Sequence, residues 1–129
     1  MRVSWKYLKE NIINDTFEMS RSPKNEERYS RFKREKGDLN LYIINTYLKN
    51  KTFVILPNAF PYELRKGIAH YVMFSIDNIS NVSNISNISD FLSAYFKKPK
   101  DHILWYINPS HLRSIPNVWH CHIFIKQDR

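Results

Sequence analysis

Two histidines, His120 and His122, stand one residue apart in the apolar run that begins at Trp119. Alternate residues of a β-strand point to the same face, so a strand over 119–126 would hold both imidazoles side by side. Imidazole can serve as a nucleophile, an acid, a base or a metal ligand near neutral pH. We therefore take this pair as a candidate catalytic or anion-binding site. The alternative is a half-buried strand whose polar face happens to carry histidines.

Other polar residues could complete such a site. Arg113 and Ser114 lie shortly before the pair, and a guanidinium and a hydroxyl group suit a phosphate, although a surface loop would explain them as well. Asn58 and Asn108 each flank a proline at the end of an expected strand, where asparagine usually makes a turn and could instead contact a sugar. His70 lies mid-strand, which favours a buried histidine with a satisfied hydrogen bond, and a sugar or base contact is its alternative role.

A metal site needs more ligands than this pair, usually three or four. His70, His102 and His111 could supply one, but no spacing motif connects them. We therefore predict no metal and no cofactor, and a metal-dependent hydrolase centred on the pair is a third interpretation. Cys121 should point to the opposite face of the strand and is expected in the core.

The composition limits the class of protein. The chain has 129 residues, enough for a single domain, and its two glycines exclude glycine-rich phosphate loops. No run of 18 apolar residues occurs, so no membrane span is expected. The N-terminus lacks the apolar segment of a signal peptide, and one cysteine rules out an internal disulfide. We expect a cytoplasmic protein.

The net charge of +8 favours an anionic partner such as a nucleotide, a sugar phosphate, RNA or an acidic protein. The basic residues are densest in the segment 28–36. This segment is either the solvated face of a helix or a nucleic-acid footprint.

The first part of the chain, residues 1–50, predicts helices. Ser4 is the expected N-cap of a first helix, and Ser22, followed by Pro23, that of a second helix that Gly37 ends. A third helical run follows. Its apolar positions at helical spacing are Leu41, Ile44, Tyr47 and Leu48.

Residues 52–126 change to strand patterns. Strands are expected over 52–56, 68–75, 103–107 and 119–126, with the low-complexity stretch 78–89 as a loop. A helix capped by Ser89 or Asp90 would be inserted between them. Its expected apolar face is Phe91, Leu92, Tyr95 and Phe96. The predicted fold is a single α+β domain over 1–129: N-terminal helices, then an antiparallel sheet of about four or five strands with one inserted helix.

Several short motifs spread along the chain resemble the fungal N-acetylglucosamine-induced protein family, which also has bacterial and giant-virus members. They are Trp5, Arg21-Ser22-Pro23, Arg28-Tyr29, Asn58-Ala-Phe-Pro-Tyr62, Gly67-Ile-Ala-His70, Leu104-Trp105-Tyr106, Leu112-Arg-Ser-Ile115 and His120-Cys-His122. The resemblance is nearly full-length. It implies an association with amino-sugar metabolism in fungi.

The order of motifs in the second part of the chain also resembles the histidine-triad superfamily, whose members hydrolyse or transfer nucleotidyl groups through a histidine nucleophile. This resemblance implies that His120 is the nucleophile and that His122 is its neighbour on the α-phosphate. The first histidine of the triad would fall on Val118, which departs from the pattern. Because such proteins often dimerise, a homodimer is also implied.

Two hypotheses from different classes follow. The first is a histidine-triad-like domain that binds a nucleotide or sugar nucleotide and hydrolyses or transfers it, with His120 as nucleophile. In that case His122, Ser114 and Arg113 would stabilise charge on the phosphate, and Asn58 and Asn108 would orient the sugar. The second is a non-catalytic adaptor that binds RNA or an acidic protein through the basic segment 28–36.

Overall fold

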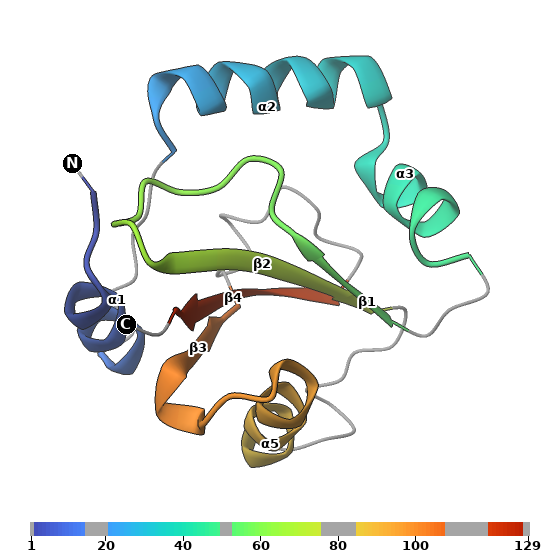
Figure 1. The fold of residues 1–129 in the computed structure, drawn as a ribbon. Helices are drawn as coiled ribbons and strands as arrows, with labels where there is room; N and C mark the ends of the chain where they lie inside the picture. Colours follow the sequence, from blue (N-terminus) through green and yellow to red (C-terminus); the bar gives the residue numbers. More distant parts are fainter. Residues whose placement is uncertain (1, 15–20, 50–52, 76–84, 108–118, 128–129) are drawn as a thin grey trace.

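Helices come first along the chain and the strands follow, as Figure 1 shows for the computed structural model of the protein. The structure describes residues 2–14, 21–49, 53–75, 85–107 and 119–127. In chain order its elements are α1 (Trp5–Ile13), α2 (Pro23–Lys36), α3 (Leu39–Thr46), β1 (Phe53–Pro57), β2 (Ile68–Ser75), α5 (Ile85–Phe96), a short 3₁₀ helix (Lys100–His102), β3 (Ile103–Tyr106) and β4 (Trp119–Lys126).

Local capping chemistry sets the ends of the first two helices. The hydroxyl oxygen of Ser4 accepts a hydrogen bond from the Tyr7 amide at 3.2 Å, and that of Ser22 accepts one from the Asn25 amide at 3.2 Å. Each bond satisfies an amide that the first turn of a helix leaves without a partner. Gly37 ends α2 with a φ angle of 70°, a region that glycine adopts without steric cost. The predicted caps and the predicted end of α2 are confirmed.

The sheet has four antiparallel strands in the order β1-β2-β4-β3. In the central pair, His70 of β2 lies opposite Phe124 of β4, and Val72 lies opposite His122. These two strands match the ranges predicted from the sequence. The α+β class, with helices before an antiparallel sheet, is therefore confirmed.

Helices cover both faces of the sheet (Figure 1). One face lies under α2 and α3, and its packing centres on Leu39, Ile43, Leu48, Val72 and Phe74. A second apolar cluster lies on the same face, where the buried Leu8 of α1 packs with Tyr62, Tyr106 and Phe124.

The other face of the sheet packs against α5. Ile88 and Leu92, one helical turn apart, contact a layer that includes Cys121, Ile123 and Ile125 of β4. Odd-numbered residues of β4 therefore belong to this layer and even-numbered residues to the α2–α3 side.

The predicted apolar face of α3 was wrong in part. Leu41 is 56% exposed and Ile44 is 39% exposed, whereas Leu39 and Ile43 are buried together with Leu48. This short helix is apolar on several sides, so its spacing alone does not select the buried face.

The start and the buried face of the inserted helix also differ from the prediction. The helix begins at Ile85 and not at Ser89 or Asp90, so the end of the low-complexity stretch is helical. Ile88 and Leu92 are buried, while Phe91 and Tyr95 are 38% and 49% exposed. The repeated Asn and Ser residues resemble a loop in composition, but Ile88 among them is buried against the layer of the sheet that contains Cys121.

None of the described helices combines the length and apolar character needed to cross a bilayer.

Candidate functional site

A cavity of about 320 Å³ lies between the sheet and the helices α2 and α3. We call the helical side the roof and the sheet side the floor. The roof residues are Arg21, Tyr29, Phe32, Leu39, Ile43 and Tyr47. The floor and the β1–β2 connection contribute Leu56, Pro57, Asn58, Ala59, Phe60, Tyr62, Val72, Phe74, His120 and His122. The size falls within the range of small-ligand sites.

His120 and His122 both line this cavity, because they are alternate residues of β4. Their ring centroids are 6.2 Å apart, and the His120 ring lies 5.7 Å from that of Phe74. Cys121 between them points to the opposite face, is fully buried, and has its pKa raised by that burial. The strand alternation in the sequence predicted this arrangement of the three side chains.

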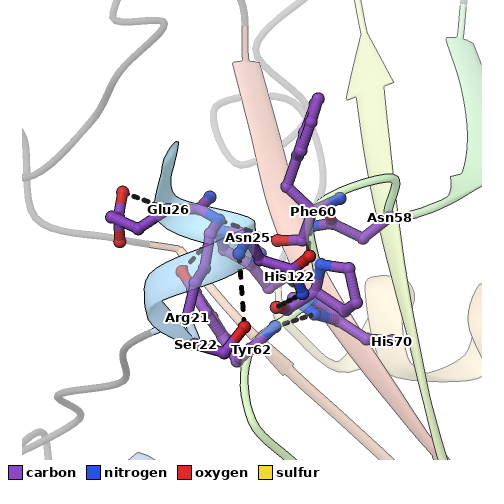
Figure 2. Close-up of polar contacts among 10 residues, drawn as sticks. Arg21, Ser22, Asn25, Glu26, Asn58, Phe60, Tyr62, His70 and His122 are labelled. Atoms are coloured by element: carbon purple, nitrogen blue, oxygen red, sulfur yellow. Dashed lines mark hydrogen bonds and ion pairs between the residues drawn. The ribbon is translucent and has the colours of Figure 1, made fainter. Parts of the chain in front are cut away.

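His70 lies directly behind His122. The two are diagonal neighbours on adjacent strands, and Nε2 of His70 is 3.0 Å from Nδ1 of His122. The backbone amide of Tyr62 donates to Nδ1 of His70 at 3.3 Å, and the Tyr62 hydroxyl lies 3.3 Å from Nε2 of His122 (Figure 2). The sequence predicted a buried, hydrogen-bonded His70. It gave no sign that its partners would be His122 and Tyr62.

Both buried histidines are held in the neutral form. Burial is the main reason that the pKa of His122 falls to about 3, and the nearby His120 and Arg21 lower it further. Burial also places the pKa of His70 well below its usual value, with smaller contributions from His122 and Arg21. At neutral pH each ring can therefore donate one hydrogen bond and accept another without adding charge to the site.

Arg21 is the cationic side chain among the described residues that line the cavity, and the sequence around it did not indicate a site residue. Its Nε donates to the carbonyl oxygen of Phe60 at 2.7 Å, and its guanidinium lies 4.2 Å from the centre of the Tyr29 ring. Glu26 approaches it at 3.7 Å (Figure 2). The only signal in the sequence was an arginine beside the N-cap Ser22, which indicates a helix start and no chemistry.

The remaining predicted site residues divide into two groups. Arg113, Ser114 and Asn108, predicted to contact phosphate or sugar, lie outside the described residues. Asn58 lines the cavity, and its Oδ1 accepts a hydrogen bond from the Phe60 amide at 2.8 Å, which is turn chemistry.

The described residues contain no group of three or more histidine, cysteine, aspartate or glutamate side chains arranged to hold a metal ion. The histidines of the site contact one another and aromatic rings.

The basic segment 28–36 lies within α2, on the roof of the cavity. Arg31 pairs with Glu27 at 3.7 Å, and the ammonium group of Lys33 lies 4.7 Å from the centre of the Tyr29 ring. Two cations of the basic segment thus contact side chains of the same helix.

The fold and the site define an α+β domain in which helices cover a histidine-bearing sheet, with a small open cavity between them. The chain belongs to the DUF3605 family, described as proteins of unknown function, whose family model matches residues 45–126. The chain is also similar to the solved structure described as "Crystal Structure of HTC1", with a TM-score of 0.73 and 20% identity over 98% of this chain and 86% of that one. At this identity the likeness shows the fold. No curated protein matches the chain.

Proposed function

We propose that this protein binds a nucleotide or a sugar nucleotide in the cavity, and that His120 attacks phosphorus to hydrolyse or transfer the nucleotidyl group. One observation carries the proposal: Arg21, His120 and His122 line the same cavity as several aromatic rings. An anionic group and a flat ring system on one ligand would match these two kinds of surface.

The phosphate would lie near Arg21. The guanidinium group keeps its charge at any physiological pH, and its planar donors suit phosphate oxygens. Its position is fixed by the bond to the Phe60 carbonyl and by the Tyr29 ring. His122, neutral at this pH, would add a hydrogen-bond donor beside it.

The rest of the ligand would contact the roof. Tyr29, Phe32 and Tyr47 provide aromatic surface, and Leu39 and Ile43 provide aliphatic surface. Aromatic side chains stack on nucleobases with little dependence on the base. A sugar or base would therefore be held mainly by stacking and apolar contact.

His120 is the proposed nucleophile. An unprotonated ring nitrogen would form a P–N bond with the phosphorus while the P–O bond to the leaving group breaks and that oxygen takes up a proton from solvent. Water, or an acceptor hydroxyl group, would then attack the same phosphorus, lose its proton to solvent and break the P–N bond. The covalent intermediate divides one difficult step into two easier ones. The resemblance to the histidine-triad superfamily implies the same role for His120.

The alternative function is a basic adaptor that binds RNA or an acidic protein through the segment 28–36. The ion pair of Arg31 with Glu27 and the position of Lys33 over Tyr29 give these cations partners within α2. The cavity has no role in this alternative. We therefore favour the small-ligand proposal.

The test is a thermal-shift screen with AMP, UDP-N-acetylglucosamine and a short RNA at low and moderate salt, since a ligand stabilises the state that binds it. We expect a salt-tolerant shift with a mononucleotide or sugar nucleotide that Arg21→Gln loses. Turnover of the hit should vanish in His120→Ala. The matched controls are Arg31→Gln, on α2 outside the cavity, and His102→Ala, also outside the cavity. A shift with RNA alone that disappears at moderate salt would support the adaptor function instead.

A further inference from the structure

We infer that His70 is a positioning residue that fixes His122 in the tautomer with its proton on Nε2, so that His122 presents an N–H donor at the cavity. The value of this donor for a phosphate ligand rests on the proposed function. The tautomer itself follows from the hydrogen-bond geometry and does not depend on the ligand.

The direction of the hydrogen bonds is set by a backbone group. The amide of Tyr62 can only donate, and it lies 3.3 Å from Nδ1 of His70. Nδ1 of His70 must therefore carry a lone pair, which in a neutral imidazole places the proton on Nε2. That Nε2–H lies 3.0 Å from Nδ1 of His122 and donates to it. The proton of His122 is then on Nε2, 3.3 Å from the hydroxyl oxygen of Tyr62.

The reverse direction would place two donors against each other. It would require Nδ1–H on His70, facing the amide N–H of Tyr62 inside the protein. A buried donor without an acceptor costs more than a typical hydrogen bond contributes. Asn58 favours the reverse direction, because its Nδ2 lies 3.3 Å from Nε2 of His70. The side chain of Asn58 can rotate away at the cost of its bond to the Phe60 amide, whereas the Tyr62 amide belongs to the backbone.

Packing holds the His70 ring in the orientation that lets it accept from the Tyr62 amide and donate to His122. The ring is 7% exposed and stacks on Phe124 with centroids 4.8 Å apart and an interplanar angle of 27°. The Tyr62 ring lies 4.8 Å away on the connection that approaches from the cavity side. Because both neighbours are large and buried, a flip of the imidazole would have to displace them.

The consequence concerns what His122 can do. With its proton on Nε2, His122 donates to the Tyr62 hydroxyl oxygen 3.3 Å away, or to a ligand oxygen that takes the place of that hydroxyl, and it does not accept a proton there. His122 thus differs in role from His120, the proposed nucleophile. The two imidazoles share a face, and it is Nδ1 of His122 that lies 3.0 Å from Nε2 of His70.

The direct test is nuclear magnetic resonance of ¹⁵N-labelled protein near neutral pH, with long-range correlations that distinguish the two histidine tautomers. The chain has five histidines, and single variants assign their signals. We expect the wild-type protein to show His122 with a protonated Nε2 and an unprotonated Nδ1. A signal for protonated Nδ1 in wild-type His122 would overturn the inference.

Two variants show whether His70 acts on His122 through its hydrogen bond or only by filling space beside it. His70→Leu fills the space without the donor and should give a mixture of His122 tautomers. The amide group of the glutamine in His70→Gln can accept from the Tyr62 amide and donate to Nδ1 of His122. This variant should therefore restore the proton to Nε2 of His122. If His70→Leu folds and leaves the tautomer unchanged, the inference fails; if it does not fold, the wild-type spectrum still decides.

Binding of AMP connects the tautomer to the proposed function. We expect His70→Leu to weaken AMP binding about fivefold, the range of one neutral hydrogen bond, and His70→Gln to recover most of it. If wild-type His122 has the expected tautomer but neither AMP nor any other nucleotide binds, the proposed function fails and the positioning role of His70 stands.

Discussion

The Nε atom of Arg21 lies 2.7 Å from the carbonyl oxygen of Phe60, across 39 residues of sequence. This hydrogen bond joins the segment that starts α2 to the connection between β1 and β2. Arg21 also stacks on Tyr29, so one side chain both supplies the charge of the cavity and ties its roof to its floor. Removing Arg21 should therefore reduce stability as well as ligand binding.

Arg21→Ala should lower the free energy of unfolding by about 2 kcal/mol, because a hydrogen bond to a charged group and a cation–π contact are lost together. Urea denaturation measures this loss. Arg31→Ala is the matched control on α2: its ion pair is exposed, with 58% of the arginine side chain accessible, and should cost less than about 0.5 kcal/mol. Equal losses for the two variants would contradict the role given to Arg21.

Stability should decrease as the pH falls below the ordinary histidine pKa of about 6.5. The pKa of His122 in the folded protein is about 3, and that of His70 is also well below its usual value. Between these limits the unfolded chain binds protons that the folded chain does not, so stability rises with pH by up to about 1.4 kcal/mol per unit for each histidine. Urea midpoints at about pH 7.5 and about pH 5 test this prediction. The variant His122→Leu, which removes one of the two groups, should show a shallower slope.

Cys121 should be inert in the folded protein. The thiol is fully buried, and burial raises its pKa, so little reactive thiolate forms. We expect a disulfide reagent to label the chain only after urea is added, and this is simple to measure because the chain has a single cysteine. Rapid labelling of the native protein would show that β4 opens away from α5. Cys121→Ser should reduce stability by about 1–2 kcal/mol, since a hydroxyl group would be buried in an apolar layer.

The chemistry of the roof leads us to expect that the cavity binds different nucleobases with similar affinity. Phe32, Leu39 and Ile43 carry no hydrogen-bonding side-chain atoms, and Tyr29 and Tyr47 carry one hydroxyl group each, so the roof offers few groups that could read the edge of a base. AMP, GMP, CMP and UMP should bind within about threefold of one another, as stacking without edge recognition allows. Adenosine, which lacks the phosphate, should bind much more weakly. Isothermal titration measures all five, and a preference above about tenfold for one base would contradict this prediction.

Local patterns predicted most of the framework. The caps at Ser4 and Ser22 depend on neighbouring amides, and the alternation of His120, Cys121 and His122 depends on one strand. Such relationships are contained within a few residues, so the sequence can reveal them. They also indicated which side of β4 could carry chemistry.

The contacts within the site and the buried face of α3 depended on residues far apart in the sequence. The pairing of His70 with His122 exists because β2 and β4 are adjacent with a particular register, which no single segment specifies. Arg21 reaches the cavity because the segment before α2 lies beside the β1–β2 connection, where its Nε bonds to the Phe60 carbonyl, and its own neighbours in sequence indicate only a helix start. In α3 the buried side was decided by the sheet it covers and not by its spacing.

The roof of the cavity comes from one continuous stretch, residues 21–49, and the histidines come from β2 and β4 later in the chain. Under the proposed function, the surface that contacts the sugar or base and the proposed nucleophile thus come from separate parts of the sequence. Exchange of the segment after Arg21, with Arg21 kept for its bond to the Phe60 carbonyl, would alter the surface that contacts the sugar or base while the sheet keeps its histidines. This division makes the protein a practical starting point for grafting new recognition segments onto an unchanged histidine-bearing sheet.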